Sequence, residues 1–155
     1  MYAITGASGH LGRLALDALL ETVEAAQVVA LVRDPAKLAE VAARGVQVRR
    51  FDYDAPQTLA PALAGIERLL LVSSSEVGKR AAQHQAVIDA AKAAGVKFVA
   101  YTSILRADTS PMGLAIEHRA TEAALTESGL AHALLRNGWY TENYVQSAPA
   151  AVEHG

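Results

Sequence analysis

The chain has 155 residues and no cysteine, which excludes disulfides, thiolate chemistry and cysteine-ligated metals. It also lacks an excess of charge of either sign. With 14 Lys and Arg against 16 Asp and Glu, the formal net charge is −2, so nothing points to nucleic acid or an anionic membrane as a partner. No apolar run is long enough to span a bilayer, and glycines at positions 6, 9 and 12 interrupt the N-terminal stretch where a signal peptide needs its hydrophobic region. These absences lead us to expect a cytoplasmic protein.

Hydrophobic residues make up 52% of the chain, enough for one domain with a full core. Short apolar runs alternate with Ala- and Leu-rich segments of helical spacing. This pattern predicts strands at 2–5, 28–32, 46–51, 69–73, 97–102 and 133–136, and helices at 11–23, 36–44, 57–64, 79–94 and 115–128. A continuous apolar run such as Leu69-Leu70-Leu71-Val72 is typical of a parallel strand covered on both faces. The sequence therefore predicts an α/β fold with a doubly wound, Rossmann-like parallel sheet and right-handed crossovers.

Helix ends carry their own signals. An acidic residue before a proline predicts an N-cap, so we expect Asp34 to cap the helix that begins at Pro35 and Asp54 to cap the helix at Pro56. Glycines just past predicted helices are expected to adopt the left-handed conformation that ends them, at Gly45, Gly65, Gly95 and Gly129.

The strongest functional signal is the segment Gly6-Ala7-Ser8-Gly9-His10-Leu11-Gly12, which lies between the first strand and the first helix. Glycines there allow a tight turn and close backbone approach, and the free N–H groups of the helix start can bind phosphate. The spacing is Gly-x-x-Gly-x-x-Gly and not the commoner Gly-x-Gly-x-x-Gly, so position matters more than the motif itself. Strand, glycine turn and helix in this order predict a dinucleotide pyrophosphate site, and we expect all seven residues to line it.

Ligands of a doubly wound sheet bind beyond the carboxyl ends of its strands. Arg33 follows the second strand, about 20 residues beyond the glycine turn, where NAD-specific folds place an acidic residue. A guanidinium there can hold a 2′-phosphate, so NADP(H) is favoured over NAD(H). The neighbouring Asp34 leaves an alternative open, because its carboxylate could bind ribose hydroxyls instead of capping a helix.

Polar residues also follow the other strands. Asp52, after the third strand, could accept from the adenine amino group or form a turn. The run Ser73-Ser74-Ser75 could line the ribose or nicotinamide side, although serine clusters are more often plain loops.

With these segments in register, the chain resembles the NmrA-like group of atypical short-chain dehydrogenases over its whole length. The likeness is carried by the glycine turn, Arg33, the serine run, Tyr101-Thr102-Ser103 and Leu135-Arg136-Asn137-Gly138-Trp139. The resemblance implies two-electron reduction of a small-molecule quinone by a bound nicotinamide nucleotide. It also implies a cofactor groove lined by the glycine turn, Arg33, Ser73–Ser75, Asn137, Gly138, Trp139 and Tyr140. Chains of this group usually continue into a smaller substrate domain, so residues 1–155 are expected to be an NAD(P)-binding domain from which that second domain is largely absent.

Two departures bear on the chemistry. No tyrosine has a lysine four residues on, so the Tyr-x-x-x-Lys pair of common short-chain dehydrogenases is missing. Many NmrA-like relatives carry Lys-x-x-x-Glu before the sixth strand, whereas His118 stands here four residues before Glu122. Alcohol or ketone chemistry is therefore disfavoured. Reduction of a quinone needs a weaker general acid than reduction of a ketone, because the negative charge that develops on the quinone oxygens is delocalised into the ring. The general acid stays unassigned, with Asn137, Tyr140 and Tyr144 as substrate-side candidates.

Other interpretations stay open. Tyr101, Trp139 and Tyr140 could offer aromatic surface to a flat ring or could pack in the core. His84, at helical spacing with apolar neighbours, is interpreted as a packing residue, and the histidines show no metal-ligand spacing, so no metal is expected. The alternative function is a non-catalytic NADP(H) sensor of the NmrA-like kind, although no apolar stripe marks a partner surface. A sugar-nucleotide epimerase or reductase is a weaker alternative.

Overall fold

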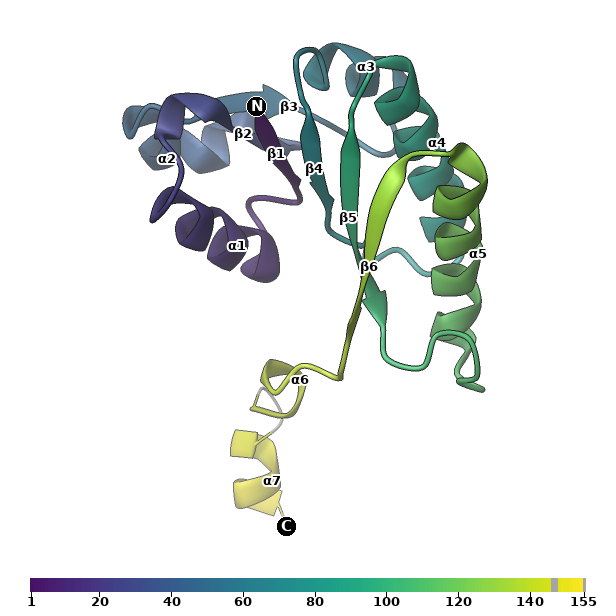
Figure 1. Cartoon of the computed structure of the whole chain (residues 1–155). Helices are drawn as coiled ribbons and strands as arrows, with labels where there is room; N and C mark the ends of the chain where they lie inside the picture. The colour runs from purple at the N-terminus through teal and green to yellow at the C-terminus, as the bar shows by residue number, and fades with distance from the viewer. Residues whose placement is uncertain (146–147, 155) are drawn as a thin grey trace.

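Six parallel strands form one sheet in the computed structural model, which describes residues 1–145 and 148–154, the side chain of His154 excepted (Figure 1). Their order is β3-β2-β1-β4-β5-β6, so the chain reverses direction across the sheet between β1 and β4. The strands are β1 (Tyr2–Thr5), β2 (Val28–Val32), β3 (Gln47–Arg50), β4 (Arg68–Leu71), β5 (Phe98–Ile104) and β6 (Ala131–Asn137). This arrangement is the predicted doubly wound, Rossmann-like sheet, and its switch point lies between β1 and β4.

Helices cover the two faces unequally. Helices α1 (His10–Leu20) and α2 (Ala39–Ala43) lie on one face, whereas α3 (Leu59–Ala62), α4 (Arg80–Ala93) and α5 (Gly113–Ser128) lie on the other (Figure 1). Short 3-10 turns precede β2, α2 and α3 at η1 (Ala25–Gln27), η2 (Pro35–Leu38) and η3 (Pro56–Thr58). Two short helices, α6 (Glu142–Val145) and α7 (Ala148–His154), follow β6 and extend away from the sheet (Figure 1). None of the described helices is long and apolar enough to cross a membrane.

The two faces bury separate apolar clusters. All five residues of β2 are buried, as its continuous apolar run predicts. The cluster under α3, α4 and α5 includes Leu69, Leu71, Val87, Ile88 and Leu125, and the cluster under α1 and α2 includes Ile4, Leu16, Leu38 and Val41.

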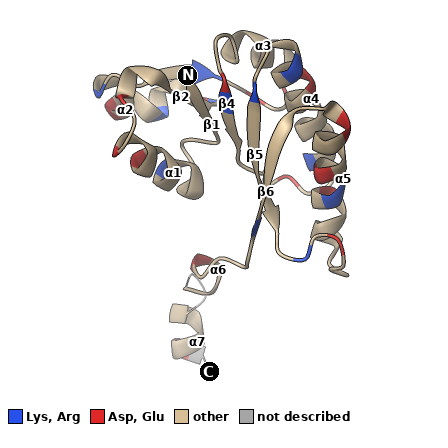
Figure 2. Cartoon of the chain, viewed as in Figure 1, with Lys and Arg blue, Asp and Glu red and all other residues tan. Residues whose placement is uncertain are grey.

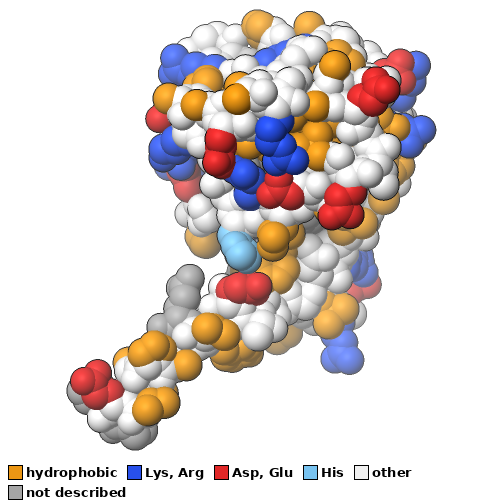
Figure 3. Space-filling model, turned by 90° about the vertical axis from the view of Figure 1, so that its left-hand side faces the viewer, with side chains coloured by type: hydrophobic (Ala, Val, Ile, Leu, Met, Phe, Trp, Pro, Cys, Tyr) orange, Lys and Arg blue, Asp and Glu red, His pale blue; other side chains and the backbone are white. Residues whose placement is uncertain are grey.

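The expectation that helices cover both faces throughout is wrong for the β4 and β5 part of the α1 side. A shallow apolar depression lies there between α1 and β5, lined by Tyr2, Ile4, Ala15, Leu19, Leu70, Phe98 and Ala100 among others. Beyond β6 the C-terminal arm, residues 138–145 and 148–154, projects from the body and carries hydrophobic side chains on its surface (Figure 3). Trp139 and Tyr144 are 55% and 65% exposed. The sequence marked no apolar stripe as a partner surface, but this arm exposes several hydrophobic side chains, because it lies outside the layers that bury the rest.

Lys and Arg residues alternate with Asp and Glu residues along the helices of both layers (Figure 2). The acidic and basic residues, whose formal charges sum to −2, are thus distributed among many elements, as the sequence pattern indicates.

Several element ends differ from the predictions. The helices expected at 36–44 and 57–64 begin as 3-10 turns, and only 39–43 and 59–62 are α-helical. Pro61 lies inside α3, and because proline has no backbone N–H it cannot donate the hydrogen bond that would extend the α-helix back into η3. Strand β6 is longer than predicted because all seven of its residues pair with β5, from Ala131 opposite Phe98 to Asn137 opposite Ile104.

The glycine stops are confirmed, since the backbone φ at Gly45, Gly65, Gly95 and Gly129 lies between 74° and 93°. The Asp34 cap is confirmed too, because its Oδ1 accepts from the Ala36 N–H at 3.1 Å. The Asp54 cap is wrong. Ala55 holds the N-cap position of η3, and the Asp54 carboxylate instead accepts from Gln83 at 2.9 Å.

Candidate functional site

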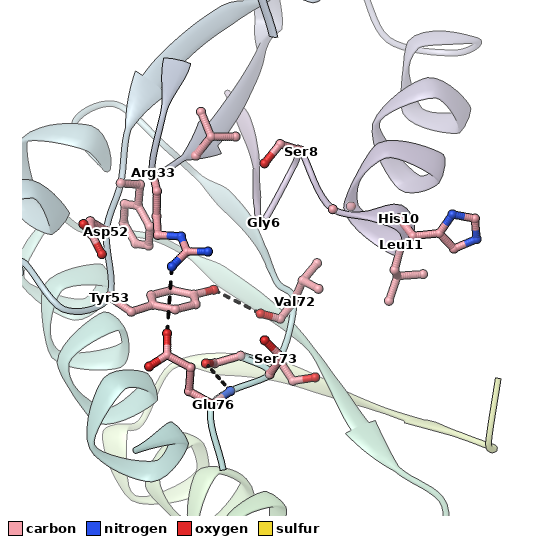
Figure 4. Close-up of a pocket in the computed structure, with 16 residues that line it drawn as sticks. Gly6, Ser8, His10, Leu11, Arg33, Asp52, Tyr53, Val72, Ser73 and Glu76 are labelled. Carbon is pink, nitrogen blue, oxygen red and sulfur yellow. Dashed lines mark hydrogen bonds and ion pairs between the residues drawn. The ribbon is translucent and has the colours of Figure 1, made fainter. Parts of the chain in front are cut away.

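A pocket of about 310 Å³ lies at the carboxyl ends of β1, β2, β3 and β4, beside the switch point of the sheet (Figure 4). Each wall therefore comes from a different strand end, as expected for a doubly wound sheet. Its lining residues are Gly6, Ser8, Gly9, His10, Leu11, Gly12, Val32, Arg33, Phe51, Asp52, Tyr53, Val72, Ser73, Ser74, Ser75 and Glu76.

The glycine turn is closed by a hydrogen bond from the Gly9 N–H to the Gly6 carbonyl at 2.9 Å, and Gly6 has a φ of 60°. A Cβ on Gly12 would lie 2.2 Å from the Gly6 carbonyl oxygen, so the start of α1 can pack on the turn only with glycine there. A Cβ on Gly9 would lie 3.2 Å from the same oxygen. The turn therefore packs closely under the start of α1 and places that helix start at the pocket.

Helix α1 begins without a side-chain cap and without an acidic residue in its first turn. Its first N–H groups have no partner within the helix, which leaves them available to an anion in the pocket. The His10 side chain points away from Arg33 and Glu76 (Figure 4), and its Nε2 lies 3.5 Å from the Glu142 carboxylate of α6. Among the seven predicted turn residues, Ala7 alone does not line the pocket: it is fully buried in the core below.

Arg33 follows β2 and carries its guanidinium to the mouth of the pocket, where the side chain is 74% exposed. Its Nη1 lies 3.9 Å from the carboxylate of Glu76, which comes from the loop after β4, so the pair bridges two walls (Figure 4). Asp34 is committed to its helix cap and is absent from the pocket lining. The geometry therefore favours Arg33 over Asp34 as the residue that meets a ligand.

Asp52 lines the pocket, but its Oδ1 accepts from the Asp54 N–H at 3.1 Å, so this oxygen forms the turn that the sequence left as an alternative. The neighbouring Tyr53 lies across the pocket floor (Figure 4). Its hydroxyl lies 3.0 Å from the Val72 carbonyl and 2.8 Å from Thr5 Oγ1, and burial raises the pKa of this phenol. Tyr53 thus joins the ends of β1, β3 and β4.

The serine run forms the wall opposite Arg33, and its three residues differ in burial. Ser74 is 7% exposed and its Oγ accepts from the Glu76 N–H at 3.2 Å, whereas Ser75 is exposed. The Ser73 N–H donates to Thr102 of β5 at 2.8 Å. All three line the pocket.

Asn137, Gly138, Trp139 and Tyr140 do not line this pocket. Asn137 ends β6, its Nδ2 donates to the Tyr140 hydroxyl at 3.0 Å, and its carbonyl accepts from the Leu105 N–H. The contact between His10 and Glu142 nevertheless brings the segment after β6 next to the start of α1. The segment thus borders the site on the β6 side without closing the pocket.

Below β5 and β6 lies a set of buried polar side chains that the sequence did not assign to a site. Tyr101 is fully buried, so the alternative that it offers aromatic surface to a ligand is wrong; its hydroxyl lies 2.6 Å from His118 Nδ1. Burial lowers the pKa of His118 to about 4. Glu122 accepts from Ser103 at 2.6 Å and from Arg136 at 2.7 and 3.0 Å; burial opposes its ionisation, but these bonds outweigh it and its pKa is lowered. The positions where relatives carry Lys and Glu are thus filled by buried, bonded groups.

Five pocket residues were not singled out from the sequence: Val32, Phe51, Tyr53, Val72 and Glu76. Each lies at or just past the end of β2, β3 or β4, so the strand-end rule that found Arg33 could have found them. Polarity, which served as the filter, does not mark the apolar ones.

The pocket matches the needs of a dinucleotide. The glycine turn leaves backbone amides at the helix start uncovered, and a guanidinium lies at the mouth. These are donors for phosphate groups, and Ser73–Ser75 would hold polar groups on the other wall.

Comparison with known proteins gives the same class. Residues 6–155 match the NAD(P)H-binding family, and the chain belongs to it. Over its whole length the chain is 61% identical to quinone oxidoreductase 2 of Escherichia coli strain K12 and spans 54% of that protein. An NmrA-like family domain-containing oxidoreductase of Aspergillus flavus is 36% identical over 150 residues, 92% of this chain and 49% of that protein. The NmrA-like resemblance is thereby confirmed.

A solved relative shows the same architecture. The crystal structure of the NADPH-dependent quinone oxidoreductase from Escherichia coli, complexed with NADPH, has a TM-score of 0.96 and 61% identity to this chain. The match covers all of this chain and 55% of the other. The chain therefore spans about half the length of the relatives it matches.

Proposed function

We propose that this chain is the NAD(P)-binding domain of an NADPH-dependent quinone reductase. The observation that carries the proposal is the glycine turn, which places the uncapped start of α1 at the same pocket that Arg33 lines. The 61% identical Escherichia coli relative, solved with NADPH, supports both the nucleotide and the reaction. Because the chain spans only about half of that relative, the activity is a proposal for the protein of which this domain forms the nucleotide half.

The pocket residues divide into roles along a bound nucleotide. The amides of His10, Leu11 and Gly12 at the start of α1 would hold the pyrophosphate, since the helix start adds a favourable dipole. Arg33 would hold the 2′-phosphate, which favours NADP(H) over NAD(H). Asp52 would lie near the adenine and the serine wall near the ribose or nicotinamide.

The reaction needs little acid catalysis. A bound reduced nicotinamide supplies a hydride, and with one proton from solvent the quinone becomes a hydroquinone. The domain's part is to orient the ring and to hydrogen-bond the developing phenolate. Tyr140 suits this role, because its hydroxyl accepts from Asn137 at 3.0 Å and so keeps its own proton for a second acceptor. Asn137 and Tyr144 are the other candidates on this side.

Two measurements test the proposal. Nucleotide binding is followed by titrating the chain with NADPH and NADH and recording the change in nicotinamide fluorescence. Quinone reduction is followed in a protein that joins this domain to the part of the Escherichia coli relative that it does not match, by loss of NADPH absorbance with a series of benzoquinones and naphthoquinones, without added flavin or metal. Absence of NADPH binding would refute the assignment of the pocket, whereas binding without quinone-dependent oxidation would favour an NADP(H) sensor.

A further inference from the structure

The loop after β4, residues 72–79, supplies the serine wall of the pocket, and its backbone is held by side chains from three other elements. The Ser73 N–H donates to Thr102 of β5 at 2.8 Å. The Ser74 N–H donates to Nε2 of His84 in α4 at 3.0 Å, and the Ser74 carbonyl accepts from Arg80 Nε at 2.5 Å. The loop conformation is therefore set from behind the pocket.

A glutamate of α5 completes this support. Glu117 accepts from the Gly78 N–H at 2.9 Å through one carboxylate oxygen and from Arg80 Nη1 at 3.1 Å through the other. The ion pair is largely removed from water, with the Arg80 and Glu117 side chains 6% and 14% exposed. Breaking it would leave a buried charge without its partner, which is costly.

His84 is a single defined tautomer in this arrangement. A backbone N–H can only donate, so Nε2 of His84 must be unprotonated. The ring is fully buried, and burial together with the nearby Arg80 lowers its pKa to about 3, so it is neutral and carries its proton on Nδ1. That proton faces Thr121 Oγ1 at 3.0 Å, and the threonine hydroxyl donates in turn to the Glu117 carbonyl at 3.0 Å. The bonds thus run in one direction, from the pocket loop to α5.

We infer that His84, Thr121, Arg80 and Glu117 are positioning residues for the nucleotide site, which hold the Ser73–Ser75 wall through the backbone of Ser74. This inference rests on the proposed function. It divides the serine run: Ser74 has its N–H, carbonyl and Oγ committed within the protein, so Ser73 and Ser75 face the nucleotide.

The test compares Thr121→Val with Thr121→Ser. The valine removes the hydroxyl to which His84 donates, and the serine restores it. Thr126→Val is a matched control, because Thr126 makes the same bond to the carbonyl one turn earlier, Glu122, on the outer side of α5. NADPH dissociation constants are measured at a temperature where circular dichroism shows every variant folded. We expect Thr121→Val to weaken NADPH binding about fivefold or more, and Thr121→Ser and Thr126→Val to stay within twofold of the original chain.

A second readout does not need the nucleotide. In the free protein, a ¹⁵N spectrum should show Nε2 of His84 unprotonated at neutral pH, and exchange of the Ser74 amide with solvent should quicken in Thr121→Val. A lower melting temperature with unchanged NADPH affinity would show that the residues only stabilise the fold and would overturn the inference. Failure of the unaltered chain to bind NADPH would instead refute the proposed function, while the Ser74 exchange would still test the support itself.

Discussion

Arg33→Ala is the substitution that best separates NADPH from NADH. The guanidinium is exposed at the pocket mouth, and its neighbour Glu76 lies 3.9 Å away, so binding of a 2′-phosphate must replace that ion pair. A charge-assisted hydrogen bond contributes about 1.5–3 kcal/mol, and an exposed ion pair about 0–1 kcal/mol. The difference is about 0.5–3 kcal/mol, which corresponds to a loss of roughly twofold to 150-fold in NADPH affinity.

The assay is titration of both nucleotides into the original chain and the variant. NADH has no 2′-phosphate, so its affinity should change by less than about twofold. Arg44→Ala is a matched control, since Arg44 is also an exposed arginine but pairs with Asp17, away from the pocket. Equal affinities of NADPH and NADH for the original chain, or equal losses of both in the variant, would refute the assignment of Arg33.

Four further changes test the assignments of the glycine turn, Tyr140 and the buried histidines. Gly12→Val should lower the free energy of unfolding in urea by at least about 2 kcal/mol, because its Cβ would meet the Gly6 carbonyl oxygen at 2.2 Å. Gly9→Val should stay folded by circular dichroism and lose NADPH binding. Normal NADPH binding by Gly9→Val would show that the turn is merely structural. Tyr140→Phe should lower kcat for quinone reduction about tenfold with NADPH affinity unchanged, and an unchanged kcat would exclude this hydroxyl as the donor. The folded-state pKa values of His84 and His118, about 3 and 4, lie below the ordinary 6.5, so the folded protein binds fewer protons than the unfolded chain. The free energy of unfolding should therefore be full above about pH 6.5 and fall toward pH 5 by up to about 1.4 kcal/mol per pH unit for each histidine. A urea midpoint that stays constant over this range would contradict the burial of both histidines as neutral rings.

Most of the fold could be predicted because short stretches of consecutive residues determine where its strands lie and where its helices end. The buried run Val28–Val32 and the glycine stops carry their conformation in a few consecutive residues. The uncovered depression beside Leu70 and Phe98 could not be predicted in the same way. An apolar strand has the same sequence whether its second face is covered by a helix or left open.

The pocket could be predicted in outline because topology brings strand ends together. Arg33, Asp52, the serine run and every residue of the glycine turn except Ala7 line it. Asn137 and its neighbours were placed there by family resemblance, and the structure sets them beside the pocket and not in its wall.

The support behind the pocket could not be predicted. His84 stands among apolar residues at helical spacing, which indicates packing, yet both ring nitrogens hydrogen-bond to residues on other elements. The Asp54 error has the same origin, since its carboxylate pairs with Gln83 of α4. Bonds between elements depend on how helices pack on the sheet, and no short sequence pattern records that.

We propose that this domain presents NADPH to a quinone, and steady-state loss of NADPH absorbance measures that reaction. The domain is 61% identical to the matched part of the Escherichia coli relative. For the assay it is joined to the rest of that relative and supplied with a simple benzoquinone in the absence of flavin and metal. We expect oxidation of NADPH that depends on the quinone, and we expect Arg33→Ala to raise KM for NADPH. Tight NADPH binding by the joined protein without quinone-dependent oxidation would contradict the proposal.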